Sequence, residues 1–131
     1  MGPGFVGIEP RPKAAVLIAA NGGLVTRVTI PAGLPNLANQ SCATRTMWFQ
    51  AMTSIEPIRL MPLASTTALL FQAGRSDPIV PPADAQALFD AASGPKELRW
   101  YDAGHVLPPH AATEKHDWLH QRIGIDPRPG A

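Results

Sequence analysis

The stretch that decides the fold is residues 67–81, which read TALLFQAGRSDPIVP. Its first part is a mostly apolar run in which apolar and polar side chains do not alternate, and Gly74 follows it closely. Runs of this kind, closed by a turn residue, are typical of a parallel strand that is covered on both faces. We therefore predict a strand over 67–72, and Asp77 then lies in the loop beyond its carboxyl end.

Two other segments have the pattern of strands. Residues 13–20 read KAAVLIAA, and a pair of glycines follows them. A short buried helix is the alternative that their alanine content allows, but the glycines favour the end of a strand covered on both faces. Residues 97–101 read ELRWY, and their alternation is typical of a strand at a sheet edge or one covered on a single face. The chain thus has about three predicted strands.

Helical patterns follow the second and third strands. In residues 82–92 apolar side chains recur every three or four positions, and a proline pair at the start favours the first helical turn. A second helix is predicted over 111–123, where Gly124 suits the C-terminal cap. One face of that helix carries Ala112, His116, Leu119 and Ile123. Alternating strands and helices predict right-handed crossovers and a parallel sheet, in a single α/β domain over residues 1–131.

Residues 24–65 form a long excursion between the first and second strands, with a helix predicted near 37–52. Excursions of this length within a compact α/β domain are usually lids or binding elements, so we expect a cap-like role. The alternative is that Trp48, Phe49 and Met52 only pack against the sheet.

The composition excludes several classes of partner. The 131 residues carry a formal net charge of +1 with 16% charged side chains, so the chain lacks the clustered basic charge that nucleic acid or an anionic membrane requires. The longest apolar run, residues 14–20, is well short of the ~20 residues that cross a bilayer. The single cysteine, Cys42, excludes an internal disulfide and is expected to be a buried thiol within a helix. The cytoplasm, a reducing compartment, is the expected location.

Polar residues follow two of the predicted strands at the points where the strands end. Asp77 follows 67–72, and His105 follows 97–101. Because parallel strands joined by one crossover are neighbours, both side chains should lie at one edge of the sheet, within reach of each other. Taken singly, Asp77 is better explained as a turn residue and His105 as a polar strand-end residue. As a pair they predict the acid and base that support a nucleophile, with no cofactor.

Two segments carry a resemblance to a known family. Residues 70–81 (LFQAGRSDPIVP) and 96–105 (KELRWYDAGH) are similar to segments in the C-terminal part of α/β-hydrolases. The resemblance is close to the branch of the dienelactone hydrolases and the acetyl-xylan-esterase-like enzymes. The resemblance implies that Asp77 is the acid of a Ser-His-Asp triad and that His105 is its base.

The resemblance extends upstream of these segments. Residues 9–18 are similar to the end of the helix after the family's nucleophile and to the strand that follows it, and 24–65 lies where the family inserts its cap. The implied fold is a partial α/β-hydrolase, with about three parallel strands, flanking helices and a cap-like excursion. The implied activity is serine-esterase-type hydrolysis of a small carboxylic ester. Met47, Trp48 and Trp100 are the residues that the resemblance suggests for an acyl pocket.

The family's nucleophile has no counterpart among the serines of the sequence. In the family it lies on a Gly-x-Ser-x-Gly turn between a strand and a helix, ahead of both the acid and the base. Ser76 comes nearest, because Gly74 lies two residues before it, but Pro78 stands where the second glycine is needed. By analogy the nucleophile falls shortly before Met1, with the half of the fold that carries it. Loss of the nucleophile costs a serine triad about a million-fold in turnover.

Two other functions compete with this one. The first is a non-catalytic, oligomerising hydrolase fragment, in which the open edge of the 13–20 strand pairs with a second copy of the chain. The second is zinc binding by His116 and His120, which lie one helical turn apart, with His105 and His110 nearby in sequence. An ordinary amphipathic helix with polar surface residues explains that spacing better, so no metal is expected.

Overall fold

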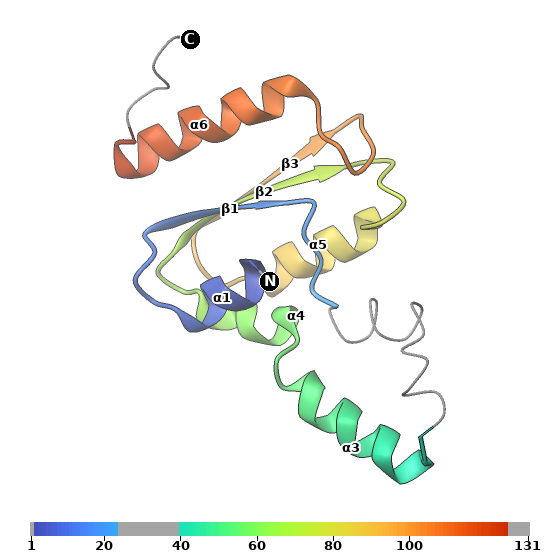
Figure 1. The fold of residues 1–131 in the computed structure, drawn as a ribbon. Helices are drawn as coiled ribbons and strands as arrows, with labels where there is room; N and C mark the ends of the chain where they lie inside the picture. The colour runs from blue at the N-terminus through green and yellow to red at the C-terminus, as the bar shows by residue number, and fades with distance from the viewer. Residues whose placement is uncertain (1, 24–39, 126–131) are drawn as a thin grey trace.

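The computed structural model describes residues 2–23 and 40–125, and its centre is a parallel sheet with the strand order β1-β2-β3 (Figure 1). The strands are β1 (Ala14–Ile18), β2 (Ala68–Gly74) and β3 (Lys96–Tyr101). They are the three predicted strands, and the predicted parallel direction is confirmed. β2 extends beyond its predicted end because the buried run continues through Ala73 to the glycine.

Helices cover both faces of the sheet (Figure 1). One face carries α1 (Gly2–Ile8), α4 (Pro57–Leu60), the 3₁₀ helix η2 (Met61–Leu63) and α5 (Pro82–Ala91). The other face carries α6 (Pro109–Ile123), which ends at a glycine in the left-handed conformation, as its sequence predicts. No helix in the described ranges has the length and apolar character needed to span a membrane.

The face under α1 and α5 holds the apolar core. Leu17 of β1 packs there with Leu69 and Phe71 of β2, since alternate residues of a strand point to the same side. Met61 and Leu88 come from the covering helices, and neither has any exposed surface. Full burial of one such side chain stabilises a fold by about 1.5–3 kcal/mol, so this face anchors the sheet.

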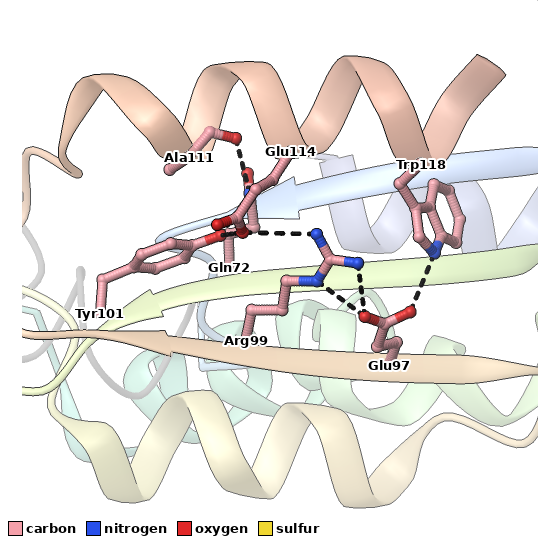
Figure 2. A network of polar contacts seen from close by, with 7 residues as sticks. All are labelled: Gln72, Glu97, Arg99, Tyr101, Ala111, Glu114 and Trp118. Carbon is pink, nitrogen blue, oxygen red and sulfur yellow. Dashed lines mark hydrogen bonds and ion pairs between the residues drawn. The ribbon is translucent and has the colours of Figure 1, made fainter. Parts of the chain in front are cut away.

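The opposite face of the sheet meets α6 through polar side chains (Figure 2). Glu97, Arg99 and Tyr101 alternate along β3, so their side chains share this face. Trp118 Nε1 donates a hydrogen bond to Glu97 Oε2 at 3.1 Å, and the Tyr101 hydroxyl donates one to Glu114 Oε2 at 2.7 Å. The helix therefore turns Trp118 and Glu114 toward the sheet.

This docking uses a different face of α6 from the one on which its apolar positions share a spacing. The buried residues of the helix are Ala111 and Trp118. The predicted face is only half-buried or exposed, and its members are Ala112, His116, Leu119 and Ile123. Apolar spacing selects the face that would suit an apolar sheet, but β3 presents charged and hydroxyl groups here. These groups pair with helix residues that can form hydrogen bonds.

Strand β1 is less buried than predicted. Only Leu17 is buried in it, and Ile18 exposes 46% of its surface. The prediction of a strand buried on both faces is therefore wrong for β1. Within the described ranges β1 pairs with β2 alone, so it lies at an edge of the sheet. Its exposure agrees instead with an open sheet edge.

The excursion over 24–65 lies partly outside the described residues, which leave out 24–39. Its predicted helix is α3 (Cys42–Thr53), which begins later than predicted because Ser41 Oγ caps it by accepting a hydrogen bond from the Thr44 N–H at 3.1 Å. No residue of α3 is buried. Packing of this helix into the core is therefore ruled out, while the cap-like role stays a prediction.

Cys42 is exposed, so the prediction of a buried thiol is wrong. The residue does begin a helix, as predicted, but that helix extends away from the sheet (Figure 1). A position in a helix hides a small apolar side chain only where the helix packs against the core.

Candidate active site

The carboxyl ends of β2 and β3 bring Asp77 and His105 into contact. Gly74 pairs with Tyr101 in the register of the two strands, so the loops that leave them start side by side. His105 Nδ1 lies 2.9 Å from Asp77 Oδ2. The proximity predicted from the order of strands and helices is confirmed.

Asp77 is held rigidly from both of its carboxylate oxygens. Its side chain exposes only 1% of its surface, and Oδ1 accepts hydrogen bonds from the backbone N–H groups of Ile79 at 2.8 Å and Val80 at 2.9 Å. This local turn is typical of aspartate, and Pro78 within it restricts the backbone. Burial by itself raises the pKa of Asp77, but the Val80 N–H, His105 and the Ile79 N–H together hold that pKa below its ordinary value. The carboxylate is therefore ionised at neutral pH.

His105 is positioned by one ring nitrogen, and its side chain is partly exposed. An ionised carboxylate only accepts hydrogen bonds, so Nδ1 must carry the proton that it shares with Asp77. In the neutral ring Nε2 is then the unprotonated nitrogen, the form that a general base requires. The side chain of His105 keeps 41% of its surface exposed, so the ring is within reach of solvent.

Trp100 lies beside the acid loop, which we define as residues 75–81. It packs with Ala73, Val80 and Ala85, and the guanidinium of Arg75 lies over its ring at 5.8 Å. The indole is thus partly buried against the apolar cluster that includes Val80 of the acid loop.

Met47 and Trp48, the other two residues suggested for an acyl pocket, are not brought to the dyad by the structure. Both belong to α3, which extends away from the carboxyl ends of β2 and β3 (Figure 1). Met47 exposes 69% of its surface, and Trp48 makes an edge-to-face contact with Phe49 in the same helix. Any contact between this helix and a substrate requires an arrangement other than the one described.

The described serines do not supply a nucleophile elbow. Ser76 lies in the acid loop, which leads from β2 into α5. Its backbone N–H donates to Ala103 O at 3.0 Å, which ties it to the neighbouring loop. Ser76 thus occupies the loop of the acid, as its sequence context indicates.

The described residues also contain no group of three or more His, Cys, Asp and Glu side chains arranged to hold a metal ion. The pair His116 and His120 lies on α6, where His120 Nδ1 is 2.6 Å from the backbone oxygen of Ile125.

Sequence reasoning missed the polar contacts that hold α6 next to the site (Figure 2). Gln72 is 1% exposed, and its Nε2 donates to the Tyr101 hydroxyl and to Ala111 O, both at 2.8 Å. Burial and the hydrogen bond with Glu114 raise the pKa of Tyr101 to about 12. The same bond is the main reason that the pKa of Glu114 lies below its ordinary value. One feature of the sequence could have indicated these contacts. Gln72 is a single amide within an apolar strand, and a buried amide needs hydrogen-bonding partners.

Among known proteins, only solved structures show a similarity to this chain. No family model matches the sequence, and no curated protein matches it. Among solved structures, the chain is similar to the acetyl xylan esterase from Paenibacillus sp. R4, with a TM-score of 0.66, 17% identity, and coverage of 93% of this chain and 42% of that one. It is also similar to acetyl xylan esterase 1 from Thermoanaerobacterium sp. JW/SL YS485, with a TM-score of 0.64, 17% identity, and coverage of 93% and 43%.

A third similar structure is a PEG-bound cold-adapted esterase from an Arctic intertidal metagenomic library, with a TM-score of 0.62, 18% identity, and coverage of 93% of this chain and 42% of that one. The chain thus spans about two-fifths of the length of these esterases, and it has a partial α/β-hydrolase fold, as the resemblance implied.

Proposed function

We propose that this chain provides the acid and the base of a serine-esterase-type site for small carboxylic esters. Asp77 is the acid and His105 is the base. The observation that carries the proposal is the 2.9 Å contact between a buried, ionised carboxylate and a half-exposed imidazole at the carboxyl edge of a parallel sheet. That edge is where open α/β sheets place their reactive groups.

The chemistry follows from the two nitrogens of His105. Nε2 takes the proton of a hydroxyl group as that oxygen attacks the ester carbonyl, and Asp77 stabilises the imidazolium through Nδ1–H. The same proton then passes from Nε2 to the leaving alcohol. Because none of the serines in the 131 residues has the elbow context, we place the nucleophile outside them, on a segment that completes the sheet beside β1.

Without that nucleophile the dyad can activate only water. General-base catalysis contributes roughly 10²–10⁴-fold, far below the roughly million-fold that a serine nucleophile adds. We therefore expect slow hydrolysis of an activated ester by these 131 residues. An acyl pocket that includes Trp100, Met47 and Trp48, a kinship with the dienelactone hydrolase branch, and a cytoplasmic location remain parts of the proposal.

Hydrolysis of p-nitrophenyl acetate tests the role of the dyad. The comparison is between the unmodified chain, His105→Ala and His120→Ala, where the last variant controls for direct attack on the ester by exposed histidines. His105→Ala should reduce the rate to that of buffer, and His120→Ala should leave it unchanged. Equal rates for the unmodified chain and His105→Ala would remove the proposed base.

The open edge of β1 favours a second candidate function, a non-catalytic module that pairs with another copy of itself. Ile18 exposes 46% of its surface on this strand, and Ile123 of the adjoining α6 exposes 41%. Light scattering at micromolar concentration should then give a dimer or a higher oligomer. Ile18→Lys should yield monomers, whereas Leu63→Lys, at a 64% exposed position away from β1, should not. A monomeric unmodified chain would contradict this alternative.

A further inference from the structure

We infer that Gly74 is a positioning residue for the dyad: because it lacks a side chain, the turn before His105 can approach β2 closely enough for the imidazole to reach Asp77. The geometric part of this inference is independent of the proposed function, and only its effect on turnover rests on that function.

The approach of the turn to Gly74 leaves no room for a methyl group. A Cβ atom at Gly74 would lie 2.2 Å from Gly104 O, 2.5 Å from Ala103 O and 3.1 Å from Ala103 C. All three are backbone atoms, which cannot rotate away as the end of a side chain can. An alanine at this position therefore forces the strand end and the turn apart.

Backbone hydrogen bonds join the same two segments beyond the ends of the strands. The Arg75 N–H donates to Tyr101 O at 2.8 Å, and the Ser76 N–H donates to Ala103 O at 3.0 Å. These bonds continue the pairing of β2 with β3 into the two loops, and they depend on the same close approach. These bonds thus hold the start of the acid loop against the turn, directly after Gly74.

The displacement passes directly to the base, because His105 is the next residue after Gly104. Relief of a 2.2 Å contact to van der Waals distance requires a movement of about 1 Å. The hydrogen bond between Asp77 and His105 is 2.9 Å long, and such bonds weaken beyond about 3.2 Å. A misplacement of about 1 Å can cost on the order of 10²-fold in rate.

Two other glycines provide matched controls. A Cβ at Gly104 would meet only Ser76 O, at 3.8 Å, so Gly104→Ala places a methyl group in the same turn without a clash. A Cβ at Gly94 would lie 2.4 Å from Ala64 O and 2.7 Å from Thr67 O, so Gly94→Ala creates a comparable clash. Gly94 precedes β3, at the opposite end of the sheet from the dyad.

The test is the proton NMR resonance of His105 Nδ1–H, which a hydrogen bond to a carboxylate moves downfield and protects from exchange with water. Gly74→Ala should lose this resonance and raise the pKa of the Asp77 carboxyl, measured by carbon NMR, because the His105 hydrogen bond no longer favours the ionised form. Gly104→Ala and Gly94→Ala should keep both features, although Gly94→Ala lowers stability. Retention of the resonance in folded Gly74→Ala would overturn the inference.

A second measurement covers the case in which Gly74→Ala does not fold. In the unmodified chain the amides of Arg75 and Ser76 should exchange with deuterium as slowly as those of β2, and exchange as fast as in exposed loops would overturn the inference. Esterase activity separates the two proposals. Loss of the resonance in Gly74→Ala, in a chain without His105-dependent hydrolysis, would support the positioning role and reject the proposed function.

Discussion

The two loops at the carboxyl edge of the sheet hold their key residues in opposite ways. In the acid loop, Asp77 is 1% exposed and uses both oxygens in hydrogen bonds. In the loop after β3, His105 is 41% exposed and is fixed through Nδ1. The Asp77 carboxylate is bound to the backbone of its own loop, whereas the His105 imidazole is bound to that carboxylate. A supporting acid and an accessible proton acceptor require this division of roles.

The largest expected effect is a difference in the free energy of unfolding between variants of Asp77 and of His105. Asp77→Ala leaves the N–H groups of Ile79 and Val80 without their acceptor, and such losses cost about 1–3 kcal/mol for a buried group. We expect the free energy of unfolding to fall by about 3 kcal/mol for Asp77→Ala and by about 1 kcal/mol or less for His105→Ala. Urea unfolding measures both. Equal losses would remove the contrast between the loops.

The next effect concerns the rate. Asp77→Asn keeps the shape of the side chain and an oxygen for the backbone N–H groups, but its amide N–H can donate a hydrogen bond to Nδ1. The imidazole then adopts the other tautomer, with the proton on Nε2, and can no longer accept one there. Hydrolysis of p-nitrophenyl acetate should fall to the level of His105→Ala while the urea midpoint stays closer to that of the unmodified chain. Unchanged hydrolysis would show that the acid does not support the base.

A smaller effect is expected in how the stability of the fold depends on pH in acidic solution. The pKa of Asp77 is lower in the folded chain than in the unfolded chain, so its ionisation adds stability above the unfolded value. That stability is lost as the pH falls through the folded value. Urea midpoints measured across the acid range should therefore fall less steeply for Asp77→Asn than for the unmodified chain. Parallel curves would contradict the assigned pKa.

The smallest effect concerns the last residue of β3, which directly precedes the loop that carries His105. Tyr101 is the single tyrosine of the chain, so ultraviolet absorbance of tyrosinate reports on it alone, with an expected midpoint at about 12. Burial is the main cause and the Glu114 hydrogen bond adds to it, so Glu114→Gln should lower the midpoint only in part. Lys115→Gln, a neighbouring charge change, is the control. A midpoint near the ordinary tyrosine value would mean that α6 does not hold the end of β3.

The sequence could predict the features that follow from the order of strands and helices, but not those that depend on contacts with distant residues. Asp77 and His105 were predictable as neighbours because strands that alternate with helices are parallel and adjacent, and both residues follow strand ends. The inner face of α6 was not, because it depends on Glu97, Arg99 and Tyr101, which lie on another element. The exposure of Cys42 was also out of reach, since a local pattern predicts a helix without saying what packs against it. Close approach at Gly74 likewise depends on a turn distant in sequence.

The tautomer of His105 tests the central claim most directly. Nitrogen NMR of ring-labelled histidine, with His105→Ala to assign the signals, distinguishes a protonated from an unprotonated ring nitrogen. In mildly alkaline solution we predict a protonated Nδ1 and an unprotonated Nε2, and Asp77→Asn should reverse them. A proton on Nε2 in the unmodified chain, or a rapid mixture of both tautomers, would contradict a base held ready by the buried carboxylate.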